Sequence, residues 1–102
     1  MSIAKKYLSG DGVCKVTFTL PDSLAETAKT AHVVGEFNNW DSVSLPMKKA
    51  KNGKFALSLE LQKNNEYQFR YLVDGTSWET DWEADALAPV PFADEHNSVV
   101  KV

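Results

Sequence analysis

The chain has 102 residues, of which 43% are hydrophobic and 25% charged, and its formal net charge at pH 7 is −3. This size and composition predict one globular domain, residues 1–102, that can fold without disulfides or metals. The eleven Lys and Arg residues are mostly interleaved with acids, and no segment has the apolar length of a membrane span. Both observations argue against nucleic acid and membranes as partners.

Two features near the start of the chain indicate its surroundings. Residues 1–6 lack the apolar run of a signal peptide, which favours a cytoplasmic location. Cys14 is the single cysteine and lies in the apolar phase of a strand pattern. We therefore expect Cys14 to be a buried small hydrophobe rather than a reactive thiol.

The first half of the chain alternates apolar and polar residues in two short runs, as strands with one buried face do. The first run, 14–20, ends at Pro21, and Ser23 to Glu26 has the spacing of a capping box that would open one helical turn. A second strand is expected at about 29–35, with Ala31 and Val33 facing one way and His32 and Val34 the other.

The second half continues the period of two. The run 55–61 follows Asn52-Gly53, which favours a two-residue hairpin, and the lysines of 48–51 would lie at its solvated end. The run 67–73 places Gln68, Arg70 and Leu72 opposite its aromatic face, and a short run closes the chain at 98–102. Several short strands without a long helical period predict an all-β sandwich.

Residues suited to catalysis are few. His32 falls inside a predicted strand, and His96 lies near the end of the chain beside acids and Asn97. A Ser-His-Asp arrangement stays open, but no nucleophile elbow and no loop cysteine mark a nucleophile. The residues therefore favour a domain that is not an enzyme.

A row of alternating acids follows Trp78. Glycoside hydrolysis uses two carboxyl groups, and calcium is bound by carboxylates, so both uses are open. A solvated edge that resists pairing with another sheet is the simpler interpretation, and we predict no metal and no cofactor. The acids are Glu79, Asp81, Glu83 and Asp85.

Two tryptophans lie just beyond strand-like runs. Trp40 ends a Gly-Glu-Phe-Asn-Asn run that is typical of a surface loop, although it could also fold back over the core. A sugar ring offers a face of C–H groups and a rim of hydroxyls, so it suits a flat aromatic platform with polar groups at its edge. Trp40 and Trp78 could be such platforms, with Arg70 and Asn97 binding hydroxyls.

These residues occur in an order that resembles carbohydrate-binding module family 48, over about 30–102. The family comprises glycogen- and starch-binding early-set domains of isoamylases, branching enzymes and the beta subunit of AMP-activated protein kinase. The matching pieces are Val33 to Trp40, Leu45-Pro46-Met47, Gly53-Lys54-Phe55, Tyr67 to Gly75, Trp78, and Asn97 to Val100.

The resemblance implies an immunoglobulin-like β-sandwich that binds α-1,4-linked glucan without catalytic residues of its own. Trp40 and Trp78 match the two stacking tryptophans, and Arg70 stands where glycogen-binding members have a lysine. Phe92 falls near a leucine that reaches past the sugar in kinase-type members. The chain departs from those members at His96-Asn97, where they tend to have two asparagines, and by one extra residue between Gly75 and Trp78.

Three functional hypotheses follow. The first is a non-catalytic module for glycogen, starch or maltooligosaccharides, with Trp40, Arg70, Trp78 and Asn97 as its site and Phe92 and His96 as further contacts. The second is an accessory or regulatory protein-interaction domain on the same fold, because exposed Trp and Arg also serve protein interfaces. The third is an enzyme. The implied partners are an α-glucan and a separate glucan-metabolising enzyme or kinase.

Overall fold

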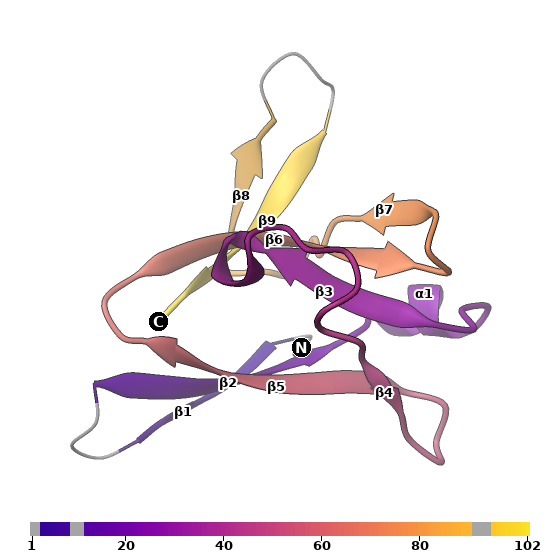
Figure 1. Ribbon diagram of the computed structural model, residues 1–102, viewed down its shortest axis with the longest axis horizontal. Coiled ribbons are helices and arrows are strands. Elements are labelled where there is room, and N and C mark those ends of the chain that lie inside the picture. Colours follow the sequence, from indigo (N-terminus) through magenta and orange to yellow (C-terminus); the bar gives the residue numbers. More distant parts are fainter. Residues whose placement is uncertain (1–2, 9–11, 91–94) are drawn as a thin grey trace.

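The computed structural model describes residues 3–8, 12–90 and 95–102. Within these ranges the strands form two antiparallel sheets that lie face to face (Figure 1). The first sheet has the order β1-β2-β5-β4, and the second has the order β3-β6-β9-β8 with β7 also paired to β6. The elements are β1 (Ile3–Tyr7), β2 (Val13–Thr19), α1 (Asp22–Ala25), β3 (Ala31–Gly35), the 3-10 turn η1 (Glu36–Asn38), β4 (Lys48–Lys49), β5 (Phe55–Gln62), β6 (Glu66–Val73), β7 (Ser77–Glu79), β8 (Ala86–Pro89) and β9 (His96–Lys101).

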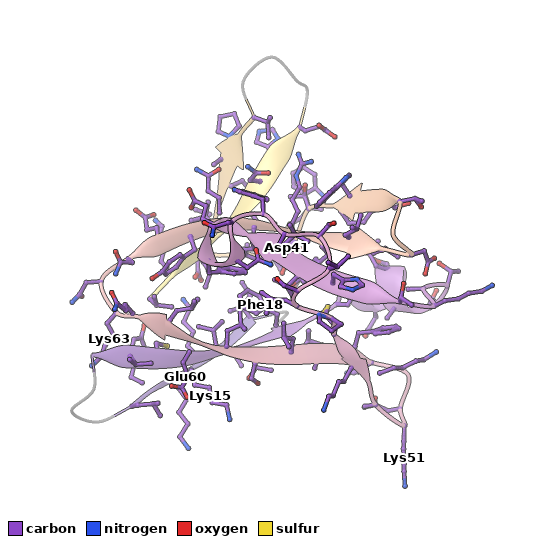
Figure 2. All side chains as sticks on the ribbon, in the orientation of Figure 1. Lys15, Phe18, Asp41, Lys51, Glu60 and Lys63 are labelled. Carbon is purple, nitrogen blue, oxygen red and sulfur yellow. The ribbon has the colours of Figure 1, made fainter. Side chains whose placement is uncertain are left out.

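The core lies between the two sheets and is built from the residues that alternate inward. Cys14 and Phe18 of β2 are fully buried, and the Phe18 ring meets the edge of Phe69 from β6 with centroids 5.0 Å apart. Figure 2 shows Phe18 between the sheets, whereas Lys15 and Glu60 point away from them. The predicted all-β sandwich and the buried cysteine are confirmed.

Two local predictions are wrong. The helical turn forms, but its N-cap is Pro21, whose carbonyl accepts hydrogen bonds from the backbone of Leu24 and Ala25, so Ser23 caps nothing. The β4–β5 hairpin has a three-residue loop, 51–53, because the Ala50 N–H donates to the Lys54 carbonyl at 2.7 Å and closes it. Within this loop the Gly53 N–H donates to the Ala50 carbonyl, and Gly53 has a φ of +83°. As predicted, the lysines lie at an exposed hairpin end, and Lys51 projects from its tip (Figure 2).

The outer face of the second sheet contains the feature that positions the site. One side of β6 pairs with β3, while its other side pairs with β9 over 66–69 and then with β7 over 71–73. Arg70 lies at this change of partner. The centre of this outer face is not open to solvent. Three of its residues are buried although they do not belong to the main core: Val34, Leu72 and Val99.

No helix in the described ranges has the length and apolarity needed to cross a membrane.

Candidate functional site

A shallow pocket of about 410 Å³ opens where β6 changes partner. Four of the six predicted site residues line it together with Val90, and they come from the η1 loop, β6, β7 and β9. The structure thus brings together segments that are far apart in the sequence. We call this site the Trp40–Trp78 pocket; the predicted residues on its wall are Trp40, Arg70, Trp78 and Asn97.

Trp40 lies in a turn with left-handed backbone conformation that several hydrogen bonds stabilise. Asn39 and Trp40 have φ values of 56° and 57°, which costs a non-glycine residue about 1–2 kcal/mol. The Trp40 N–H donates to the Gly35 carbonyl at 2.9 Å, and the Asn38 side chain binds the Gly35 N–H and the Asp41 carbonyl, each at 3.0 Å. These bonds stabilise a turn that leaves Trp40 40% exposed.

Phe37, and not Trp40, covers the core at this end of the sandwich. Its ring lies 5.7 Å from Phe18 and 6.4 Å from Phe69, centroid to centroid. The turn can approach β6 because residue 35 is glycine: a Cβ there would lie 2.6 Å from the Gln68 carbonyl oxygen. The alternative in which Trp40 folds back over the core is therefore wrong.

Trp78 lies inside the short strand β7, opposite Leu72, and not at a turn as the sequence pattern suggested. Its side chain is 45% exposed. The preceding turn is fixed by Asp74, whose Oδ1 accepts hydrogen bonds from Lys29 N at 2.7 Å and Thr30 N at 3.0 Å. These backbone bonds, that of Thr30 first, lower the pKa of the Asp74 carboxyl.

Arg70 provides unsatisfied donors at the wall of the pocket. Its side chain is only 12% exposed, and its Nη2 forms an ion pair with Glu95 Oε2 at 3.7 Å, a distance too long for a hydrogen bond. Neither Nε nor Nη2 has a hydrogen-bond acceptor within the described part of the chain, although both atoms are buried. Beside them, Asn97 Nδ2 donates to Gln68 Oε1 at 3.0 Å, which orients the Asn97 amide.

The acidic row is not a uniformly solvated face, and that prediction is wrong at Asp81. Asp81 is fully buried, and its Oδ2 and Oδ1 accept hydrogen bonds from the Tyr71 hydroxyl and the Glu83 N–H, both at 3.0 Å. Its own N–H donates to Ser98 Oγ at 2.6 Å. Burial, and then the Asp81 charge, raise the pKa of Tyr71. Asp81 therefore fixes the segment between β7 and β8 to the core.

The remaining acids of the row differ from Asp81. Glu83 is exposed, and Asp85 forms an ion pair with Lys5 at 2.6 Å. No group of three potential His, Cys, Asp or Glu ligands is close enough to hold a metal among the residues described.

Of the two further contacts that were predicted, His96 does not line the pocket. His96 is half-buried and its ring lies 5.9 Å from that of Trp82, centroid to centroid. Phe92 lies outside the described residues. The sequence analysis did not single out Trp82, because it lies within the row of acids. In the structure this side chain is 67% exposed, and its being a tryptophan is the only feature of the sequence that would have drawn attention to it.

Comparison with known proteins identifies the family. The model of carbohydrate-binding module 48, the isoamylase N-terminal domain, matches residues 11–88, well over half of the chain. The chain belongs to this family. Over 70 residues it is also 39% identical to Protein PTST homolog 2, chloroplastic, of Arabidopsis thaliana. That match covers 69% of this chain but only 11% of the plant protein, which is much longer. The similarity is therefore confined to one segment of the plant protein.

Proposed function

We propose that this family 48 domain is a non-catalytic module that binds α-1,4-linked glucan in the Trp40–Trp78 pocket. The observation that carries the proposal is the convergence of two half-exposed tryptophans on the buried, unsatisfied N–H groups of Arg70. Membership of a carbohydrate-binding family supports the ligand class.

The chemistry of the pocket suits a sugar ring. Indole faces cover the C–H face of a pyranose at little entropic cost, because a tryptophan has only two side-chain torsions to fix. Affinity is expected to be modest, with a Kd of about 10 μM to 1 mM, or roughly −4 to −7 kcal/mol.

Arg70 gives the proposal its polar part. A buried N–H group without an acceptor costs about 1–3 kcal/mol, so the Arg70 guanidinium gains by turning toward a sugar hydroxyl that accepts from it. The Asn97 amide, oriented by Gln68, adds a second polar group on the same wall. A neutral ligand rich in hydroxyl oxygens is therefore better matched than an apolar one.

The proposed partner of the glucan-bound domain is a catalytic protein or domain that acts on the same glucan. In this proposal the module supplies binding, and chemistry takes place elsewhere.

Paired variants test the proposal. Trp40→Ala and Trp78→Ala should each weaken maltoheptaose binding by about 1–3 kcal/mol, or roughly 5- to 150-fold, while the melting temperature stays nearly unchanged. Tyr7→Ala is the matched control, because Tyr7 is also an exposed aromatic residue but lies on the first sheet. Equal losses in all three variants, or unfolding of both tryptophan variants, would contradict the proposal. Folded wild-type protein that binds no glucan would favour a protein interface on the same surface.

A further inference from the structure

Trp82 is the most exposed of the three tryptophans and takes no part in the Trp40–Trp78 pocket. A side chain of this size is usually buried, so an indole that is 67% in solvent requires an explanation. Trp82 follows β7, the strand that carries Trp78.

A separate hollow of about 300 Å³ lies beside Trp82, between the residues that follow β7 and the start of α1. We call it the Trp82 hollow. None of its lining residues lines the Trp40–Trp78 pocket. Besides Trp82, its wall includes apolar Pro21 and Leu24, the hydroxyl-bearing Ser23, and the carboxylates Glu79 and Glu83.

The backbone on both sides of Trp82 is held by hydrogen bonds. Before it, Asp81 is hydrogen-bonded to Tyr71 and Ser98 in the core, and Thr80 Oγ1 donates to the His96 carbonyl at 2.6 Å. After it, the Glu83 N–H donates to Asp81 Oδ1 at 3.0 Å. The His96 ring lies against Trp82 at 5.9 Å. A platform that is already ordered loses little freedom when a ligand binds, so it contributes more of its contact energy to affinity.

We propose that the Trp82 hollow is a second α-glucan-binding site, in which the indole stacks on a glucose unit. The Ser23 hydroxyl and the carboxylates of Glu79 and Glu83 accept hydrogen bonds from sugar hydroxyls. The Trp40–Trp78 pocket, by contrast, offers mainly the donors of Arg70. The inference rests on the proposed function of that first pocket.

Two sites on one small domain favour a polymeric ligand. Trp78 and Trp82 are four residues apart, so their Cα atoms are at most about 15 Å from each other. A glucan chain, or two branches of one polymer, that occupies the first site raises the effective concentration of sugar at the second. The domain should therefore bind glycogen more tightly than maltotriose, and part of that gain should depend on Trp82.

Nuclear magnetic resonance can observe both sites at once, because the chain has three tryptophans and hence three indole N–H resonances. Each resonance is assigned with a Trp→Phe variant. On titration with maltotriose, we expect all three to shift, with Trp82 saturating independently of the other two. In Trp40→Ala the Trp82 shift should persist, and in Trp82→Ala the shifts of Trp40 and Trp78 should persist.

Binding to glycogen supplies a second readout. Trp82→Ala should lower the apparent affinity for glycogen by at least about tenfold, while the maltotriose affinity of the first pocket is unchanged. Glu83→Gln should weaken the Trp82 response to maltotriose without moving the responses of Trp40 and Trp78.

The outcomes separate the two proposals. Shifts confined to Trp40 and Trp78 would overturn the second site and leave the first intact. No shift at any tryptophan would overturn both. N-acetylarginine amide, with the citrulline analogue as its neutral control, tests the acidic rim; a Trp82 response to the arginine compound but not to maltotriose would assign the hollow to a cationic partner and overturn the inference.

Discussion

Replacing Asp81 by alanine should destabilise the domain strongly, although its position in the row of acids suggests a solvated residue. The change removes the acceptor of the buried Tyr71 hydroxyl and of the Glu83 N–H. A hydrogen bond to a charged group contributes about 1.5–3 kcal/mol, but loss of the carboxylate also removes its desolvation cost. The expected net loss is roughly 2–4 kcal/mol in the free energy of unfolding, or about 10–25 °C in melting temperature for a domain of this size.

Urea unfolding followed by far-ultraviolet circular dichroism measures this loss. Glu83→Ala is the matched control, because Glu83 belongs to the same alternating row but is exposed, and it should change stability by less than about 0.5 kcal/mol. Tyr71→Phe breaks one of the same bonds, so its effect and that of Asp81→Ala should not be additive. A loss below about 1 kcal/mol for Asp81→Ala, or equal losses for Asp81→Ala and Glu83→Ala, would refute the buried-anchor argument.

Two further predictions concern the turns that present the tryptophans. Gly35→Ala places a Cβ 2.6 Å from the Gln68 carbonyl oxygen, so it should lower the free energy of unfolding by about 1–3 kcal/mol and weaken glucan binding through Trp40; an unchanged urea midpoint would contradict the close approach. The pKa of the Asp74 carboxyl lies below its ordinary value of 3.8, so its contribution to stability is present above pH 3.8 and is lost as pH falls through the lower folded pKa. The stability gap between wild type and Asp74→Asn should therefore be constant near neutral pH and shrink in acid, and a gap that is independent of pH would count against it.

The sequence predicted the central strands because their alternation is strong. In β2 and β6 every second side chain enters the core, as Phe18 and Phe69 do. The sequence did not predict strands β1, β4 and β8. Their residues are largely exposed or half-buried, so the alternation of hydrophobic and polar residues is weak there. Asp81 was misplaced because the period-two pattern assumes a strand, whereas the Ala84 N–H bonds to the Asp81 carbonyl in a turn.

The types of side chain in the candidate site could be predicted from the chemistry of sugars, but the alternation of strands alone did not predict that they converge, and only the family resemblance grouped them. Their convergence depends on the change of β6 partner at Arg70 and on the positive φ of Trp40, and both are set by contacts between distant segments. The ion pair of Arg70 with Glu95 and the exposure of Trp82 likewise depend on the folded arrangement.

Titration of the wild-type protein with maltoheptaose, followed by tryptophan fluorescence, tests the proposed glucan site most directly. A cello-oligosaccharide of similar length is the control, because it differs in the linkage between its glucose units. We predict a saturable change in tryptophan emission with the α-glucan alone, with a Kd of about 10 μM to 1 mM. No response up to several millimolar maltoheptaose, or an equal response to the cello-oligosaccharide, would contradict an α-glucan-binding pocket at Trp40 and Trp78.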